Sequence, residues 1–129
     1  MYELRIIGEF SSAHKLRDYE GKCENLHGHN WKVEVFVEAE KTDKSGLVID
    51  FKILKEKLNS ITSEIDHCYI NDLKYFQEHN PTSENIAEYI FKKMDISLKE
   101  YPVRLKKITV WENEKQSASY LDSAKYKMK

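Results

Sequence analysis

The sequence of 129 residues lacks the features of several classes of protein. Its 21 basic and 22 acidic residues are closely mixed and give a formal net charge of -1, so there is no basic stripe for nucleic acid. No apolar run approaches the roughly 20 residues that span a membrane. Residues 1–10 carry charges at positions 3, 5 and 9 and have no apolar core of the length found in signal peptides. We therefore expect neither a nucleic-acid partner nor a membrane partner.

Cysteine is scarce as well, with Cys23 and Cys68 as the two examples. Two cysteines do not make a disulfide framework, which predicts a soluble protein of the reducing cytoplasm. Aromatic and branched aliphatic residues occur throughout, and this excludes extensive disorder. Internal repeats and low-complexity segments are absent. The length predicts one domain over residues 1–129 that buries roughly two-thirds of the surface of its unfolded chain.

Two alternating stretches, residues 2–14 and 27–39, predict neighbouring strands. In a strand, side chains two residues apart point to the same face. On that parity His14 falls on the apolar face of the first strand, and His27 and His29 fall on that of the second. If the strands pair antiparallel, the three imidazoles converge at one end of one face. The apolar residues that share their parity are Tyr2, Leu4, Ile6, Phe10, Trp31, Val33, Val35 and Val37.

Two amphipathic stretches predict helices that pack an apolar face on this sheet. Over residues 51–65, apolar residues recur at spacings of 3, 4, 3 and 4, and Asp50 stands at the cap position. A second helix is expected to begin within residues 81–85, where a hydroxyl at the cap and an acid in the first turn are typical of a helix start, and to continue to about residue 97. Residues 66–80, between the two helices, are predicted to be irregular.

Two more strands are predicted near the C-terminus. Residues 103–112 are rich in β-forming residues, and residues 117–126 can pair with them across a turn at 113–116. The predicted order is β-β-α-α-β-β. It describes an α+β domain in which two helices cover one face of a four-stranded antiparallel sheet.

The three histidines are the strongest candidate for a chemical site. The alternative is that they bind no metal, but imidazoles on a buried face are costly unless each ring finds a partner. Three imidazoles with an open fourth position suit a catalytic zinc ion. Cys23, four residues before His27, is either a fourth ligand, which would make the site structural, or a thiol whose pKa the metal lowers. Spacing alone leaves both readings open.

Two further candidates are weaker. Asp66 and His67 are neighbours in sequence, which is commonplace, but from a loop both can reach a thiol and exchange its proton. Glu112 ends a predicted strand and is either an ordinary exposed acid or a carboxylate that accepts two parallel N–H bonds from a guanidine-like edge. We expect Cys68 to be a small buried residue and His79 to be an exposed loop residue.

Five separated motifs give the chain a resemblance to the 6-pyruvoyl-tetrahydropterin synthase family. They are FSSAHKL at 10–16, Cys23-x-x-x-His27-Gly28-His29, Ile65-Asp66-His67-x-x-Ile70-Asn71, PTSEN at 81–85 and Trp111-Glu112. They cover nearly the whole chain in the family's order. The gap of three residues between the cysteine and His-Gly-His resembles the bacterial branch, the 6-carboxy-tetrahydropterin synthases of queuosine biosynthesis.

The resemblance implies the tunnelling fold. Subunits of this fold associate through their sheets into trimeric barrels, which stack as a homohexamer with active sites between subunits. The implied zinc ligands are His14, His27 and His29. The implied catalytic residues are Cys23, Asp66, His67 and Glu112. The residues implied near the pterin ring are Thr82, Ser83 and Glu84, with Glu112 as its anchor.

The implied activity is that of a zinc-dependent lyase. It converts 7,8-dihydroneopterin triphosphate to 6-carboxy-5,6,7,8-tetrahydropterin and releases acetaldehyde and triphosphate. Two alternatives stay open. The same fold can form a different product, such as 6-pyruvoyl-tetrahydropterin or a simple side-chain cleavage product. A zinc-stabilised binding module without catalysis would instead use Cys23 as a fourth ligand, and chelation would unfold it.

Overall fold

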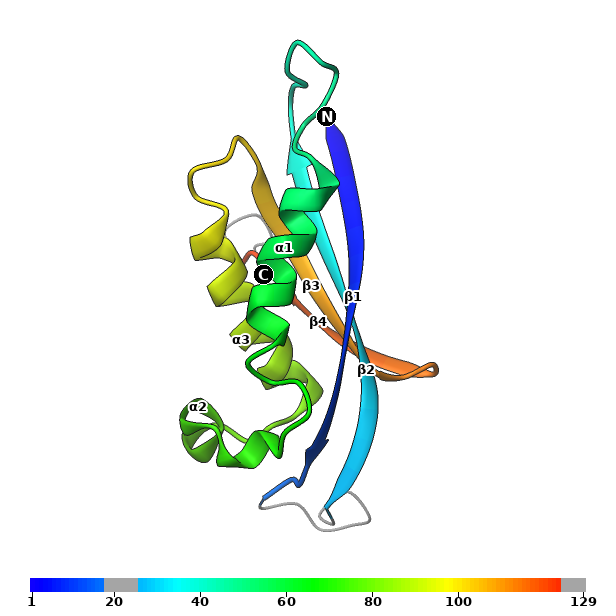
Figure 1. Cartoon of the computed structure of the whole chain (residues 1–129), viewed down its shortest axis with the longest axis vertical. Helices are drawn as coiled ribbons and strands as arrows, with labels where there is room; N and C mark the ends of the chain where they lie inside the picture. Colours follow the sequence, from blue (N-terminus) through cyan, green and yellow to red (C-terminus); the bar gives the residue numbers. More distant parts are fainter. Residues whose placement is uncertain (18–25, 124–129) are drawn as a thin grey trace, which may run out of the picture.

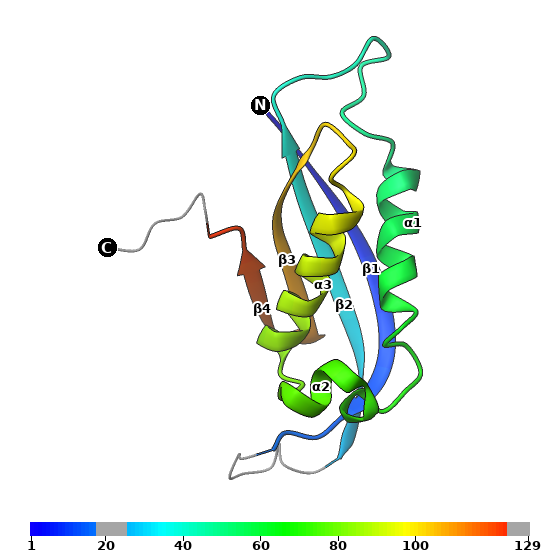
Figure 2. The ribbon, with the colours of Figure 1, turned by 90° about the vertical axis from the view of Figure 1, so that its left-hand side faces the viewer.

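The computed structural model describes residues 1–17 and 26–123. Its centre is a four-stranded antiparallel sheet in the order β1 (Tyr2–His14), β2 (His27–Ala39), β3 (Arg104–Asn113) and β4 (Gln116–Leu121). The two longest strands, β1 and β2, have the bounds that their alternation predicts. Figures 1 and 2 show the helices on one face of the sheet, with α1 over β1 and α3 over β3 and β4.

Helix α1 (Phe51–Thr62) begins where predicted, because the Asp50 carboxylate accepts the Lys52 N–H at 2.8 Å. It ends three residues before the predicted residue 65. The N–H of Ile65 bonds to the carbonyl of Thr62 at 3.0 Å, an i to i−3 bond that tightens the chain past the helix end. Ile65 is nevertheless fully buried, so the apolar spacing was a correct guide to the core and a wrong guide to the helix end.

Helix α3 (Ser83–Ser97) confirms the predicted second helix. Thr82 is the N-cap, and its hydroxyl accepts the Asn85 N–H at 3.1 Å. Glu84 lies in the first turn, where the helix dipole favours an acid. The side chains that this helix buries against the sheet are those of Ile86, Ala87, Ile90, Phe91 and Met94.

The segment between these helices was predicted to be irregular, and that prediction is wrong. It holds a 3-10 turn, η2 (Ile70–Asp72), and a short helix, α2 (Lys74–Glu78), so the described residues contain three α-helices rather than two. Ile70 and Phe76 are fully buried and anchor the segment to the core. Elements of three and five residues are too short to show a helical period in the sequence.

The last two strands differ from prediction by small amounts. β3 is shifted by one residue relative to 103–112, and β4 begins one residue early and ends at Leu121. Residues 124–126 of the predicted strand lie outside the described residues. The predicted order β-β-α-α-β-β is confirmed, with α2 as an addition. In the described chain no helix is long and apolar enough to cross a membrane.

The two faces of the sheet differ in chemistry. The covered face carries the core, including Trp31 and Val110 at 0% exposure. On the opposite face Glu34 is buried as well, but it accepts a hydrogen bond from Trp111 Nε1 at 2.5 Å and pairs with Arg5 at 3.0 Å. Because alternate residues face opposite ways, Trp111 on the open face leaves Glu112 on the covered one.

Candidate metal centre

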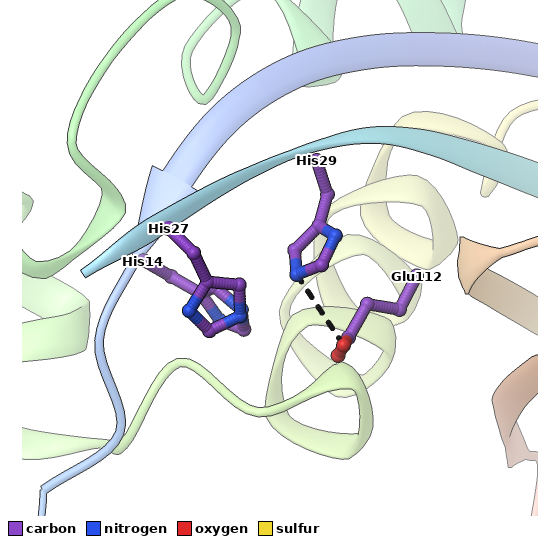
Figure 3. A group of neighbouring side chains, drawn as sticks. All are labelled: His14, His27, His29 and Glu112. Carbon is purple, nitrogen blue, oxygen red and sulfur yellow. Dashed lines mark hydrogen bonds and ion pairs between the residues drawn. The ribbon is translucent and has the colours of Figure 1, made fainter. Parts of the chain in front are cut away.

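Four side chains from three strands gather at the end of the covered face (Figure 3). His14 ends β1 and lies directly opposite His27, which begins β2; His29 follows two residues later. Glu112 comes from β3. Their ligand atoms all lie within 4.8 Å of one another, close enough to reach a single ion. The antiparallel register, which pairs residue 14 with residue 27, brings the predicted histidines together.

The nitrogens of this group lie close together. His14 Nε2 is 3.0 Å from His27 Nε2, and His29 Nε2 is 3.3 Å from Oε1 of Glu112. Among the described residues, His29 Nε2 is buried without any hydrogen bond, since the geometry toward the carboxylate is too poor for one. Such an atom is costly to bury. A cation shared by the three imidazoles would satisfy it, so the donor set fits a metal ion.

His14 is held in the tautomer that a metal requires. Its side chain is 1% exposed, and its Nδ1 donates to the carbonyl of Pro81 at 2.7 Å. A carbonyl oxygen only accepts, so Nδ1 carries the proton and Nε2 presents its lone pair to His27 and His29. Metal-binding histidines are commonly fixed in this way by their second nitrogen.

The electrostatics of the group also favour neutral rings. Burial lowers the pKa of His14 below the ordinary value of 6.5; the Pro81 carbonyl opposes this shift and the neighbouring His27 adds to it. Burial likewise lowers the pKa of His29, against the opposing effect of Glu112. For His14 and His29 this direction favours the neutral ring, which is the form that binds a metal.

Glu112 borders two cavities. One, of about 470 Å³, is also lined by His14 and by the predicted pterin-contacting residues Thr82, Ser83 and Glu84. The other, of about 520 Å³, is also lined by His29. Ser83 donates a long hydrogen bond of 3.4 Å to the second oxygen of the carboxylate. The structure therefore places Glu112 beside both the histidines and a ligand-sized space, and its proximity to His29 was not expected from the sequence.

Asp66 and His67 form a contact pair beside the metal-binding group but outside it. Asp66 Oδ1 accepts the Ser11 N–H at 2.8 Å and lies 2.9 Å from His67 Nδ1. The Ser11 N–H, followed by His67, holds the pKa of the Asp66 carboxyl below its usual range. The pair sits along the edge of β1 that β2 leaves free, and the His67 side chain is 81% exposed. Neither residue belongs to the metal-binding group.

The backbone of His67 is unusual. Its φ is +52°, the left-handed region, which costs an ordinary residue roughly 1–2 kcal/mol. The conformation is held from both sides, because the His67 N–H donates to the Ser11 carbonyl at 2.6 Å and the Cys68 carbonyl accepts the Ala13 N–H at 3.0 Å. No local pattern in the sequence marks this position.

The remaining candidates divide as follows. Cys23 lies outside the described residues. Cys68 is half-buried rather than buried, and burial raises the pKa of its thiol. His79 is exposed as expected, but it caps α2 and stacks on Tyr75 with ring centroids 4.2 Å apart.

The chain belongs to the 6-pyruvoyl tetrahydropterin synthase family, which it matches over residues 3–123. A 6-carboxy-5,6,7,8-tetrahydropterin synthase of Synechocystis sp. is 38% identical over 91 residues, which cover 67% of this chain and 69% of that protein. A dihydroneopterin monophosphate aldolase of Pyrococcus furiosus is also 38% identical, over 110 residues that cover 84% and 89%.

A solved structure agrees with the family assignment. The 6-pyruvoyl tetrahydropterin synthase of Caenorhabditis elegans superposes with a TM-score of 0.84 at 29% identity, over 94% of this chain and 95% of that chain. The fold is therefore the tunnelling fold of this family, as the resemblance implied.

Proposed function

We propose that this protein is a zinc-dependent lyase that converts 7,8-dihydroneopterin triphosphate and water to 6-carboxy-5,6,7,8-tetrahydropterin, with release of acetaldehyde and triphosphate, in queuosine (7-deazapurine) biosynthesis. The observation that carries the proposal is the convergence of His14, His27 and His29 beside Glu112, in a chain of this family. His14 and Glu112 also line a cavity. A cytoplasmic location remains a prediction from the sequence.

The three histidines would hold the zinc ion. Three imidazole ligands leave one position for substrate, which is the composition of catalytic rather than structural zinc sites. When bound, zinc supplies Lewis acidity that makes a substrate hydroxyl easier to deprotonate. The Pro81 carbonyl keeps His14 in the required tautomer throughout.

Glu112 would orient the substrate. A pterin presents a 2-amino group and a ring N–H side by side, and a carboxylate accepts such a pair of donors well. Glu112 borders both cavities, and one of its carboxylate oxygens accepts the long bond from Ser83. Anchoring the ring there would direct the side chain toward the histidines and hold it in register for proton transfer.

Asp66, His67 and Cys23 would move the protons. Cys23 as thiolate would abstract a proton from the substrate side chain, and His67, oriented by Asp66, would exchange protons with it. His67 projects from the free edge of β1 and is mostly exposed. We propose that it serves the site of a neighbouring copy of the chain in a homohexamer, a dimer of trimers.

A second product is favoured by one specific observation. The aldolase of Pyrococcus furiosus is as similar to this chain as the carboxy-forming synthase of Synechocystis. Side-chain cleavage of a dihydroneopterin phosphate is therefore an alternative beside 6-pyruvoyl-tetrahydropterin formation. Both alternatives would use the same residues. A non-catalytic zinc module is the alternative of a different class.

The test is incubation of the zinc-loaded protein with 7,8-dihydroneopterin triphosphate, followed by mass analysis of the products. The proposal predicts 6-carboxy-5,6,7,8-tetrahydropterin, acetaldehyde and triphosphate. A pyruvoyl or hydroxymethyl product would leave the site assignment and change the reaction. No consumption by the zinc-loaded protein would favour the binding module.

Cys23→Ala is the control for the role of the cysteine. The proposal predicts that this variant binds zinc normally and has no turnover. Loss of zinc together with turnover would instead identify Cys23 as a fourth ligand.

A further inference from the structure

The free edge of β1 is covered, near the metal centre, by residues 66–80. The Ser11 N–H donates to the Asp66 carboxylate, and the Ser11 carbonyl accepts the His67 N–H. The Ala13 N–H donates to the Cys68 carbonyl. After β1 ends, the backbone N–H and carbonyl groups of Lys15 and Arg17 are also hydrogen-bonded. Two side-chain amides take the place of a neighbouring strand there and hold the backbone that follows His14.

These amides are those of Asn71 and Asn80. Asn71 accepts the Lys15 N–H at 2.9 Å and donates to the Lys15 carbonyl at 2.7 Å. Asn80 does the same for Arg17, at 2.8 and 2.9 Å. Each amide thus satisfies both backbone groups of one residue, and the two asparagines are equivalent in this respect.

Asn80 differs from Asn71 in the hydrogen bonds that its own backbone carbonyl accepts. Its carbonyl accepts two bonds, from the Asn85 side-chain amide at 2.8 Å and from the Thr82 N–H at 2.8 Å. The next carbonyl along the chain, that of Pro81, is the acceptor for His14 Nδ1. The residue that precedes Pro81 is therefore held on one side by helix α3, through the Asn85 amide on its carbonyl, and on the other by the exit of β1, through its own side chain on Arg17.

We infer that Asn80 and Asn85 are positioning residues for the metal centre, which hold the Pro81 carbonyl in place against His14 Nδ1. The inference rests on the metal binding proposed above. Without the Asn85 amide, the bend at residues 80–82 loses its tie to helix α3 and keeps the Thr82 N–H on the same Asn80 carbonyl. The ring of His14 then loses part of its fixed orientation toward His27 and His29.

The test is the zinc affinity of single variants, measured by competition with a chromophoric chelator at one pH. Loss of a direct outer partner of a metal ligand typically weakens metal binding by about 10- to 100-fold. Asn85 acts one step further out, through the Asn80 carbonyl, so we expect Asn85→Ala to weaken zinc binding by about 10-fold, the lower end of that range. Asn71→Ala is the matched control, because it removes an equivalent amide that bonds Lys15, beside His14, rather than the bend at residues 80–82. We expect its zinc affinity to stay close to that of the unmodified protein.

A double-mutant cycle keeps the inference independent of folding defects. In a His14→Ala background, Asn85→Ala should cause no further loss of zinc affinity, because the two residues act through one bond. An equal loss with and without His14 would overturn the inference, as would equal losses in Asn85→Ala and Asn71→Ala. If the unmodified protein bound no zinc, the proposed function would fail instead, so the two failures are distinguishable.

Discussion

The metal-binding group and the Asp66–His67 pair are built in opposite ways. The first lies on the covered face of the sheet, and His14 within it is 1% exposed. The second lies on a strand edge, with the His67 ring 81% exposed. The first draws its side chains from three strands, whereas the second consists of neighbours in sequence held against one strand.

The metal-binding group is assembled within one chain, whereas the Asp66–His67 pair is exposed to other molecules. The histidines already face one another within one chain, so the group could take up a metal ion without a second chain. The side chain of His67 is 81% exposed, so its ring is accessible to another surface. Under the proposed function that surface is the active site of a neighbouring copy.

The largest effect is expected at a metal ligand. His29→Ala removes one of three imidazoles, so zinc affinity should fall by more than the roughly 10- to 100-fold that loss of an outer partner causes. Chelator competition measures it. His79→Ala is the matched control, since that histidine stacks on Tyr75 outside the group and its loss should leave zinc binding unchanged. Unchanged zinc affinity in His29→Ala would show that the group holds no metal.

The next effect is expected at His67. Because a positioned acid or base contributes about 10²- to 10⁴-fold, His67→Ala should lower kcat by that factor while zinc binding stays intact. Steady-state kinetics and zinc content measure the two separately. Loss of zinc in this variant would mean that the exposed pair and the metal centre are one site after all.

Mixing two inactive variants tests whether His67 acts between copies. His67→Ala and Cys23→Ala subunits, unfolded and refolded together, should regain activity, because some interfaces then combine an intact His67 with an intact Cys23. If both residues served the site of their own chain, every site would lack one of them. The mixture would then stay as inactive as its components.

A smaller effect is expected at Glu112. Bonds to a charged group contribute roughly 1.5–3 kcal/mol, so Glu112→Gln should raise KM by about 10- to 100-fold. Ser83→Ala should do less, because its bond to the carboxylate is long at 3.4 Å. Zinc affinity should be unchanged in both. A loss of zinc in Glu112→Gln would make Glu112 a ligand, which its 3.3 Å distance from His29 permits.

The smallest effect concerns pH and the Asp66 carboxyl. Its pKa is lower in the folded state than its ordinary value of 3.8, so it stabilises the fold above that value and loses this contribution as pH falls through the folded pKa. The difference in unfolding free energy between the unmodified protein and Asp66→Asn should therefore shrink toward acid pH. Urea unfolding of the metal-free proteins between about pH 7 and about pH 3 measures it. A difference that does not change with pH would contradict the assignment.

Much of the fold follows from short-range patterns. The alternation in residues 2–14 and 27–39 specifies two strands, because a period of two fits only an extended chain with one buried face. The same alternation places His14, His27 and His29 on one face before any pairing is known. The cap at Thr82 marks the start of α3, because its hydroxyl satisfies a free N–H of the first turn.

Other features escape such patterns. The end of α1 at Thr62 depends on tight bonds that Ile65 makes while it stays in the core. Helix α2 is too short to have a period of its own, and the buried Phe76 shows that packing stabilises it. These elements form because the rest of the domain provides a surface for them.

By itself, then, the sequence determined the strands, the two long helices and the common face of the three histidines, since each depends on residues a few positions apart. Only the tertiary structure decided that Glu112 lies 3.3 Å from His29, that the Pro81 carbonyl orients His14, and that His67 faces away from both. Those contacts join residues far apart in the chain. They depend on strand register and on backbone hydrogen bonds between distant segments, which no local spacing of residue types can specify.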